Sequence, residues 1–361
     1  MKAMIMAAGV GSRLEPLTFN RPKPMVPVVN RPAMEHIVKL LARHGITEIA
    51  ANLWYLPEEI TDYFQDGAKF GANLHYSREK ELLGTAGGVK KLESFLDETF
   101  VIVSGDAVTD IDLDALLRTH REKKAIATIA LRPVEDPRHF GVVITDQAGK
   151  IKAFQEKPQP GEELSKLANT GIYVFEPEIF RYIPAGEVYD FGKQVFPHLV
   201  QAELPFYGYV MNEYWCDIGT LDQYRIGHYD ILQGRVRMDI PGDWHQGGIF
   251  LGEGTQIAPT AKLGEKVVIG SNCRIGDGAE ILGETVIGNG CHIGDGTKIF
   301  ASVIWDHTLI EKGIRLVECV VGSGCRILST ANIGARVVLG DQVTVEAGQT
   351  IETGAKAPER K

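Results

Sequence analysis

Apolar residues follow two different periods along this chain, and the change falls close to residue 240. In residues 1–235, short apolar runs alternate with stretches where apolar residues recur at helical spacing. From Leu251 onwards, an apolar residue returns every six positions. Two periods predict two domains, which the length of 361 residues also favours. We predict a first domain at 1–235, a linker at 236–247, a second domain at 248–352 and a tail at 353–361.

The first pattern is typical of an α/β domain. Between the apolar runs, Ile37, Leu40 and Leu41 share one helical face that ends at Gly45, a residue suited to a helix C-cap; Leu113, Leu116 and Leu117 recur similarly. The alternation predicts a Rossmann-like, mixed but mostly parallel sheet that is covered on both faces. Such sheets bind ligands beyond the carboxyl ends of their strands. The predicted strands are Ala3–Ala7, Glu48–Leu53, Asn73–Tyr76, Phe100–Ser104, Ile126–Leu131, Val142–Thr145, Ile172–Phe175 and Tyr207–Met211.

The second pattern fits neither a helix nor a simple alternating strand. A period of six, with glycine after many of the apolar residues, indicates the hexapeptide repeat of a β-helix, three hexads to a coil. The stretch 248–352 resembles the left-handed parallel β-helix family, with about six coils. Two steps, after Ile299 and after Leu316, have five residues in place of six. The inward positions are Leu251, Ile257, Leu263, Ile269, Ile275, Ile281, Ile287, Ile293, Ile299, Ile304, Ile310, Leu316, Val321, Ile327, Ile333, Leu339, Val345 and Ile351.

Charge and cysteine content narrow the class of protein. The net charge of −9 argues against nucleic-acid and membrane-surface partners, although local cations can still bind a small anion. No apolar run is long enough to span a bilayer, and we read the first residues as a strand rather than a signal peptide. Five cysteines without a CxxC pair favour reduced thiols, and hence a cytoplasmic protein. Cys273, Cys291, Thr308 and Cys325 fall in one column of the repeat, which predicts stacked small side chains rather than a metal site.

The chemistry of the first domain begins at residues 8–13, which read AGVGSR. This stretch lacks the third glycine of GxGxxG and the Gly-Lys-Ser/Thr of a P-loop. Its glycines let the backbone approach a phosphate closely, and the Arg13 guanidinium offers several N–H groups that can donate hydrogen bonds to phosphate oxygens. Pro22 and Pro24 restrict the backbone on either side of Lys23, which aims its ammonium group. We therefore expect a loop that binds a polyphosphate.

The stretch from Gly9 to Pro24 resembles the signature of the sugar-1-phosphate nucleotidyltransferases, or NDP-sugar pyrophosphorylases. Further matches follow along the first domain: LGTAGG at 83–88, VIVSGD at 101–106, FGVV at 140–143, EKP at 156–158, NTGIY at 169–173 and YWCDIGT at 214–220. The resemblance implies catalytic roles for Arg13, Lys23 and Asp106, and Mg²⁺ held by Asp106 and Asp217. It implies nucleotide contacts at Ala8, Gly9, Gly11, Gly84, Thr85 and Gly88, and sugar-phosphate contacts at Gly141, Glu156, Lys157 and Asn169.

Other acidic residues near Asp106 are expected to have structural or solvent-facing positions. Asp112 suits the N-cap of the following helix, and we expect Asp110 and Asp114 to be solvated rather than metal ligands. Asp190 and Lys193 also match a segment of the family, but their direct role stays open.

The implied reaction converts an NTP and a hexose 1-phosphate into an NDP-sugar and pyrophosphate. The motifs look most like mannose-1-phosphate guanylyltransferases, so we expect GTP and a GDP-mannose product. Glucose-1-phosphate uridylyl- or thymidylyltransferase is the alternative. Two other classes stay open: an acyltransferase in the β-helix, where His292 and His307 lie, and a non-catalytic nucleotide-sugar sensor. We expect the β-helix to serve homo-oligomerisation or regulation.

Overall fold

The computed structural model describes residues 1–357, which form two compact units; residues 358–361, the end of the predicted tail, lie outside the described residues. The first unit comprises Met1–Gly9 and Met34–Asp217, and the second comprises Val10–Ala33 and Ile218 onwards. The domain boundaries predicted from the sequence stay a prediction. In the structure, the segment Val10–Ala33, which we call the glycine-containing loop, and the helix after Asp217 group with the β-helix.

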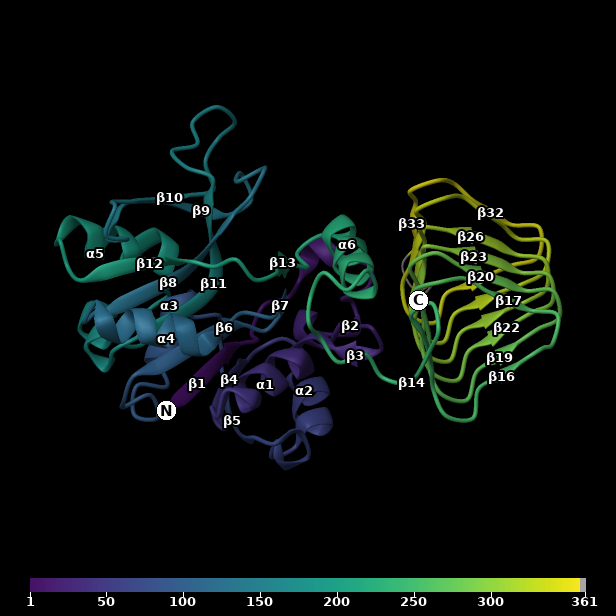
Figure 1. Cartoon of the computed structure of the whole chain (residues 1–361), viewed down its shortest axis with the longest axis horizontal. Coiled ribbons are helices and arrows are strands. Elements are labelled where there is room, and N and C mark those ends of the chain that lie inside the picture. The colour runs from purple at the N-terminus through teal and green to yellow at the C-terminus, as the bar shows by residue number, and fades with distance from the viewer. Residues whose placement is uncertain (358–361) are drawn as a thin grey trace. The chain divides into compact units, whose positions relative to one another are not determined.

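The first unit is built on one nine-stranded sheet (Figure 1). Its strands are β1 (Lys2–Met6), β4 (Glu48–Leu53), β5 (Asn73–Arg78), β6 (Phe100–Ser104), β8 (Ala127–Pro133), β9 (Gly141–Thr145), β10 (Ile151–Glu156), β11 (Leu167–Phe175) and β12 (Phe206–Val210). A separate two-stranded ribbon pairs β7 (Ala107–Thr109) with β13 (Trp215–Asp217). The helices are α1 (Ala33–Arg43), α2 (Pro57–Phe64), α3 (Gly84–Lys90), α4 (Leu113–Glu122) and α5 (Phe196–Gln201), with shorter turns at η3 (Ala68–Phe70), η4 (Pro177–Tyr182) and η5 (Phe191–Val195).

The sheet is parallel on one side and mixed on the other. The order β5–β4–β1–β6 is parallel throughout, whereas β11 joins β6 antiparallel and also pairs with β8 and β9. The Rossmann-like mixed sheet is thus confirmed, and every predicted strand forms, although β11 begins five residues before its predicted start at Ile172. The prediction missed β7, β10 and β13. β10 has only one fully buried residue, Ile151, and β7 and β13 are three residues long, so none of them gives a strong apolar signal.

The core of the first unit is rich in aromatic rings. Phe175, Phe191 and Phe196 are buried and pack in succession, with ring centroids 5.0 Å and 5.4 Å apart. Phe206 extends the stack from β12, at 5.2 Å from the Phe196 ring. These contacts join β11, η5, α5 and β12, and they place the turn that precedes η5 against the sheet.

A buried polar side chain holds the carboxyl ends of the parallel strands together. Asn52, near the end of β4, accepts a hydrogen bond from the Ala7 amide (2.9 Å) and donates one to Glu79 (2.8 Å). The other carboxylate oxygen of Glu79 accepts from the Leu83 amide, just before α3 (3.0 Å). Asn52 and Glu79 are 5% and 7% exposed. Backbone that leaves a strand loses its ladder partners, so these side chains replace them after β1 and before α3.

The second unit contains the glycine-containing loop, one helix and the β-helix. The loop holds η1 (Ser12–Leu14), η2 (Lys23–Met25) and a hairpin of β2 (Pro27–Val28) and β3 (Arg31–Pro32), and the helix is α6 (Leu221–Leu232). The remaining strands are β14 (Asp243–His245), β15 (Ile249–Leu251), β16 (Gln256–Ile257), β17 (Lys262–Leu263), β18 (Val267–Ile269), β19 (Arg274–Ile275), β20 (Glu280–Leu282), β21 (Thr285–Ile287), β22 (His292–Ile293), β23 (Lys298–Phe300), β24 (Val303–Ile304), β25 (Leu309–Ile310), β26 (Arg315–Val317), β27 (Val320–Val321), β28 (Arg326–Ile327), β29 (Asn332–Ile333), β30 (Val338–Leu339), β31 (Thr344–Val345), β32 (Thr350–Ile351) and β33 (Lys356–Ala357).

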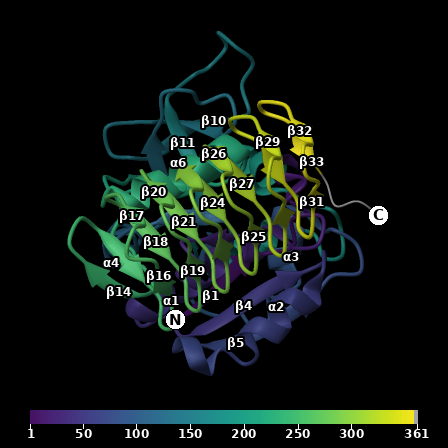
Figure 2. The same cartoon turned by 90° about the vertical axis from the view of Figure 1, so that its right-hand side faces the viewer.

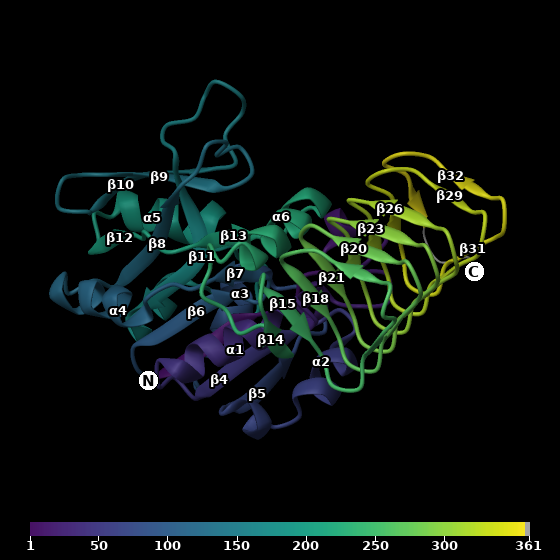
Figure 3. The same cartoon turned by 45° about the vertical axis from the view of Figure 1, so that its right-hand side comes forward.

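The left-handed β-helix is confirmed, and the six-residue period sets its register. Each predicted inward residue lies in one of the strands β15 to β32, and most of these side chains are buried in a single core. Successive coils stack with parallel pairing in the order β15–β18–β21–β24–β27–β30–β33 on one face (Figures 2 and 3). A second face has β16–β19–β22–β25–β28–β31. β14 lies in the segment predicted as a linker and pairs antiparallel with β15.

The column of small side chains inside the β-helix is also confirmed. Cys273, Cys291 and Cys325 are fully buried free thiols, and each Sγ donates to a backbone carbonyl of the next coil, at 3.0 to 3.1 Å. The Thr308 hydroxyl makes the equivalent hydrogen bond to Gly322 (2.9 Å). These residues therefore satisfy the carbonyls at one corner of the coil, which gives a structural reason for cysteine and threonine there.

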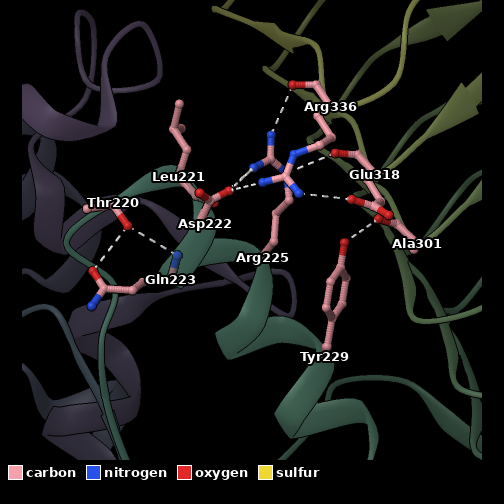
Figure 4. A network of polar contacts seen from close by, with 9 residues as sticks. All are labelled: Thr220, Leu221, Asp222, Gln223, Arg225, Tyr229, Ala301, Glu318 and Arg336. Carbon is pink, nitrogen blue, oxygen red and sulfur yellow. Dashed lines mark hydrogen bonds and ion pairs between the residues drawn. The ribbon is translucent and has the colours of Figure 1, made fainter. Parts of the chain in front are cut away.

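Helix α6 runs along another column of corners. Arg225, Tyr229 and Gln233 recur at i, i+4 and i+8, so they share one helical face. Tyr229 donates to the Ala301 carbonyl (2.6 Å), and Arg225 donates to the Glu318 carbonyl (2.8 Å) and, one coil further, to that of Arg336 (3.1 Å) (Figure 4).

At the C-terminal end of α6, the C-cap residue Gln233 donates to the Glu284 carboxylate (2.8 Å), in the coil before the one that contains Ala301. The two five-residue steps of the repeat contain Ala301 and Glu318, both with left-handed φ (47° and 53°). Both irregular steps thus lie at corners that α6 contacts, and the corners at Glu284 and Arg336 belong to regular six-residue steps.

We expect Asn52→Ala to lower the free energy of unfolding by about 2 kcal/mol, because it leaves the Ala7 amide and the Glu79 carboxylate without a buried partner. For a domain of this size, that corresponds to a fall in Tm of about 4–8 °C in thermal unfolding. Asn73→Ala is the matched control, since the Asn73 side chain is exposed, and we expect a change within about 0.5 kcal/mol. Equal effects of the two substitutions would contradict this role of Asn52.

Candidate functional site

The two predicted metal-binding aspartates lie close together, although they are more than 100 positions apart in the sequence. β13 pairs antiparallel with β7, so that Asp217 lies opposite Ala107, the residue after Asp106. Asp106 follows β6 directly, and its carboxylate accepts a hydrogen bond from the Ser104 hydroxyl. Both aspartates are half-buried. The ribbon therefore brings two carboxylates to the carboxyl end of a central parallel strand.

The last residue of β7 and the residue after it, Thr109 and Asp110, join β7 to the backbone just before β13. The Thr109 hydroxyl donates to the Tyr214 carbonyl (2.7 Å), and the Asp110 carboxylate accepts from the Tyr214 amide (2.8 Å). The prediction that Asp110 is simply solvated is wrong: its charge pairs with a backbone donor more than 100 positions away, which its local sequence could not reveal.

The other acidic residues of this stretch are placed as expected. Asp112 caps α4 by accepting from the Ala115 amide (3.0 Å), and the exposed Asp114 pairs with His44 (3.0 Å). The ligand atoms of His44, Asp112 and Asp114 lie within 4.8 Å of one another. These groups already form a helix cap and a hydrogen bond between His44 and Asp114, and exposed acidic groups often gather without an ion.

The carboxylate of Glu156 lies between two glycines. A Cβ at Gly141 would come within 2.9 Å of its Oε2, and a Cβ at Gly192 within 2.5 Å. Gly141 and Gly192 therefore leave the space that this carboxylate occupies. Burial raises the pKa of Glu156 above its usual value, against the opposing effect of the neighbouring Lys157 ammonium. Glu156 is thus a partly desolvated acceptor at the end of β10.

Lys157 and Asn169 complete the group predicted to bind a sugar phosphate. Lys157 has a left-handed φ of 45°, which is uncommon for a residue with a side chain, and its exposed ammonium lies 3.9 Å from Glu156. Strained backbone of this kind concentrates at functional sites. Asn169 accepts from the Gly171 amide (3.0 Å) and donates to the Tyr173 hydroxyl (3.1 Å), which fixes its side-chain amide in the bulge of β11.

The GTAG segment packs against the chain at 187–191. Gly84 has a φ of 73°, and a Cβ there would come within 2.5 Å of the Tyr189 carbonyl. The exposed Thr85 accepts from the Phe191 amide (2.9 Å). Gly88 leaves room for Asn52 and Glu79, whose polar atoms would come within 2.8 Å and 2.7 Å of a Cβ. Packing within the chain therefore explains these glycines, whatever ligand the segment holds.

Gly9 differs from these glycines. A Cβ at Gly9 would meet nothing within 4 Å, and the residue is exposed. The preceding Ala8 is buried, next to the Ala7 amide that Asn52 binds. The first unit therefore gives no steric reason for glycine at position 9, which suits a close approach by a ligand.

In the second unit, Gly11 and Lys23 are in contact. Gly11 has a φ of 77°, a Cβ there would lie 2.8 Å from the Lys23 Cβ, and its carbonyl accepts from the Thr18 hydroxyl (3.0 Å). Lys23 begins η2 directly after Pro22 and is 9% exposed. Arg13, in η1, is exposed and lines a cavity of about 330 Å³ with the start of α6 and with Arg225, Arg336 and Lys356.

Sequence reasoning gave no role to several residues at this end of the sheet. Asn52 and Glu79 belong to no motif that we recognised, although a polar residue inside the apolar run 48–53 was a usable signal. Trp215 packs its ring against Phe140 (5.2 Å), and among residues 1–357 its buried Nε1 has no hydrogen-bond partner. A buried donor of this kind is costly unless a ligand or water accepts from it.

His292 and His307, considered for a second active site, are both exposed on the β-helix. No helix within residues 1–357 combines the length and the apolar character needed to cross a membrane.

Comparison with known proteins agrees with the sheet and the β-helix described above. Residues 2–234 match the family described as "Nucleotidyl transferase", and residues 246–351 match the "EIF2B subunit epsilon LbH domain". A UTP–glucose-1-phosphate uridylyltransferase from Synechocystis is 41% identical over 355 residues, covering 89% of this chain and 87% of that protein. A mannose-1-phosphate guanyltransferase beta-A from Xenopus laevis is 33% identical over 356 residues, covering 97% and 96%.

A solved structure has a similar first domain. A putative glucose-1-phosphate thymidylyltransferase from Bacillus anthracis superposes with a TM-score of 0.58 at 27% identity, covering 63% of this chain and 93% of that one. Taken with the family match over most of the first 234 residues, these relatives show that the chain is a member of the nucleotidyl transferase family, a sugar-1-phosphate nucleotidyltransferase with a C-terminal left-handed β-helix.

Proposed function

We propose that this protein transfers a nucleotidyl group from an NTP to a hexose 1-phosphate, releasing pyrophosphate, and that Asp106 and Asp217 hold the divalent cation of the reaction. The observation that supports this proposal is the pairing of β7 with β13, in which Asp217 lies opposite Ala107, the residue after Asp106. One or two carboxylates, with water and substrate phosphates, form the oxygen ligand set that Mg²⁺ prefers. When bound, the ion would neutralise phosphate charge and orient the phosphates.

The chain's own residues bind and orient two anions. The sugar-phosphate oxygen is already an anion, so its in-line attack on the α-phosphorus needs no general base. The barrier lies in bringing two polyanions together and in stabilising the charge that develops. Arg13 would contact the α-phosphate and the departing pyrophosphate, and Lys23 would assist on the phosphates. Lys157 would pair with the sugar phosphate.

The sugar side is supported by two polar groups. Glu156 would accept hydrogen bonds from sugar hydroxyls, since its carboxylate is held between Gly141 and Gly192. The unpartnered Nε1 of Trp215 is a donor that a hydroxyl could satisfy. On the nucleotide side, Ala8, Gly9, Gly11, Gly84, Thr85 and Gly88 would lie along the base, ribose and phosphates.

We infer UTP and glucose 1-phosphate as the first substrate pair to test. A relative named for this reaction is 41% identical, above the 33–34% of relatives named mannose-1-phosphate guanylyltransferases. GTP and mannose 1-phosphate, the pair that the motifs predict, is the second candidate, because such a relative aligns with 97% of the chain. A homo-oligomer formed through the β-helix stays a prediction.

Pyrophosphate release, measured with four NTPs against glucose 1-phosphate and mannose 1-phosphate, tests this function. We expect one pair to exceed all others in kcat/KM by at least ~10-fold, because a site that hydrogen-bonds one base leaves polar groups unpaired with another. Release with no pair would overturn the enzymatic proposal and favour a nucleotide-sugar sensor.

Asp106→Asn and Arg13→Ala are each expected to lower kcat by ~10²–10³-fold while the far-ultraviolet circular dichroism stays unchanged, because each removes charge at the reacting phosphates. Asp114→Asn is the matched control for the first variant, since it alters an exposed carboxylate of the cluster with His44, and we expect near-normal turnover. Near-normal activity in either test variant would refute the assigned role.

We expect Glu156→Gln to raise the KM for hexose 1-phosphate by about 10-fold or more, through loss of a charged acceptor. The raised pKa of Glu156 means that its carboxylate is protonated earlier as the pH falls. The KM of the wild type should therefore rise between neutral and mildly acidic pH, whereas that of Glu156→Gln should lack this rise.

The raised pKa of Glu156 also determines how its contribution to the stability of the fold changes with pH. Because folding raises this pKa, the contribution of Glu156 to stability is present at low pH and is lost as the pH rises through the folded pKa. At neutral pH, Glu156→Gln should then be at least as stable as the wild type. The exposed Glu178, which pairs with Arg181, supplies a control in Glu178→Gln with unchanged KM. A KM for Glu156→Gln equal to that of this control would exclude Glu156 from the sugar site.

A further inference from the structure

The segment 21–33, which contains Lys23, contacts the β-helix near both of its ends. Lys23 opens η2, and β2 follows two residues after η2 ends. The Met25 amide donates to the Pro22 carbonyl (2.8 Å) and the Val26 amide to that of Lys23 (3.1 Å). Lys23 is therefore part of a compact turn whose position depends on what holds its two ends.

One of these ends is held by a chain of two hydrogen bonds. The Trp305 Nε1, from the β-helix, donates to the Tyr224 hydroxyl on α6 (2.9 Å), and this hydroxyl donates to the Pro27 carbonyl in β2 (2.5 Å). Tyr224 is 0% exposed and Trp305 is 2% exposed. The Trp305 Nε1 and the Tyr224 hydroxyl are buried polar groups, so each depends on this partnership, and the half-buried Pro27 carbonyl accepts the second hydrogen bond.

Two further contacts support the same segment from neighbouring coils. The Arg21 guanidinium lies over the Trp305 ring, 5.1 Å from its centroid, and the Asn30 side chain donates to the Ile287 carbonyl (2.7 Å). Ile287 and Ile304, the residue before Trp305, are partners on stacked strands β21 and β24. The β-helix thus contacts the loop before Lys23, at Arg21, and after it, at Asn30.

We propose that Tyr224 and Trp305 are positioning residues of the transfer reaction: the β-helix sets the position of Lys23 through the Trp305–Tyr224–Pro27 hydrogen bonds. The proposal rests on the phosphate-binding role proposed for Lys23. It gives the β-helix a part in catalysis within its own chain, in addition to any role in oligomers. Since reactive geometry tolerates little displacement, a loosened Lys23 should cost rate rather than fold.

The test compares two Tyr→Phe substitutions on one helix. Tyr224→Phe removes the hydroxyl between Trp305 and Pro27, whereas Tyr229→Phe removes a hydroxyl that bonds the Ala301 carbonyl elsewhere on α6. We expect Tyr224→Phe to lower kcat/KM for the NTP at least ~10-fold, and Tyr229→Phe to change it less than about 2-fold. Equal effects of the two variants would overturn the proposal.

A double-mutant cycle separates positioning from general stability. If Tyr224 acts through Lys23, then Tyr224→Phe should have no further effect on kcat in a Lys23→Ala background. A merely structural role predicts that the two losses multiply, which would refute the proposal. Trp305→Phe keeps a ring and removes the Nε1 donor, and should reproduce the loss. Trp244→Phe, at an exposed position on β14, is its control.

Hydrogen exchange keeps this test independent of the proposed function. Exchange at the amides of residues 21–33 should rise in Tyr224→Phe and not in Tyr229→Phe. A wild type that transfers no nucleotidyl group would refute the proposed function, and the exchange result would still decide whether the hydrogen-bond chain holds this segment. Equal exchange in both variants would refute the positioning role even if the wild type were active.

Discussion

The conformation at the carboxyl ends of the parallel strands depends on the hydrogen bonds of Asn52. Backbone that leaves a parallel strand loses its ladder partners, and the loop must find others or remain solvated. Here Asn52 and Glu79 supply them for Ala7 and Leu83, and the missing Cβ of Gly88 makes room for both side chains. One buried polar pair therefore sets where the first loop leaves β1 and where α3 begins.

The β-helix belongs to the same structural unit as the glycine-containing loop and α6. One face of α6 follows a column of its corners, and Tyr224 joins it to the hairpin after Lys23. A repeat array could tolerate a uniform six-residue period throughout. The two shortened steps instead fall at Ala301 and Glu318, whose carbonyls accept hydrogen bonds from α6. Both departures from the repeat therefore lie at corners that α6 contacts, although α6 also contacts Glu284 and Arg336 in regular six-residue steps.

Glycine occurs in the family motifs for more than one physical reason. Gly84, Gly88 and Gly141 make room for other parts of the chain, whereas Gly9 faces open space. Motif resemblance alone treats all of them as ligand contacts. The structure separates glycines that make room for other parts of the chain from one that faces open space. It also draws attention to Asn52 and Glu79, which lie outside the motifs, and to Trp215, a motif residue to which the sequence assigned no role.

The sequence by itself determined the two periods, the strands with strong apolar runs, the coil register and the cysteine column, because each follows from side-chain patterning over a few residues. It also identified the motif residues through resemblance. Only the tertiary structure decided that Asp217 lies opposite Ala107, that Asp110 binds the Tyr214 amide and that α6 contacts a column of corners that includes both shortened steps. These contacts join residues 70 or more positions apart. Their partners are chosen by how the packed elements meet, which a local pattern does not encode.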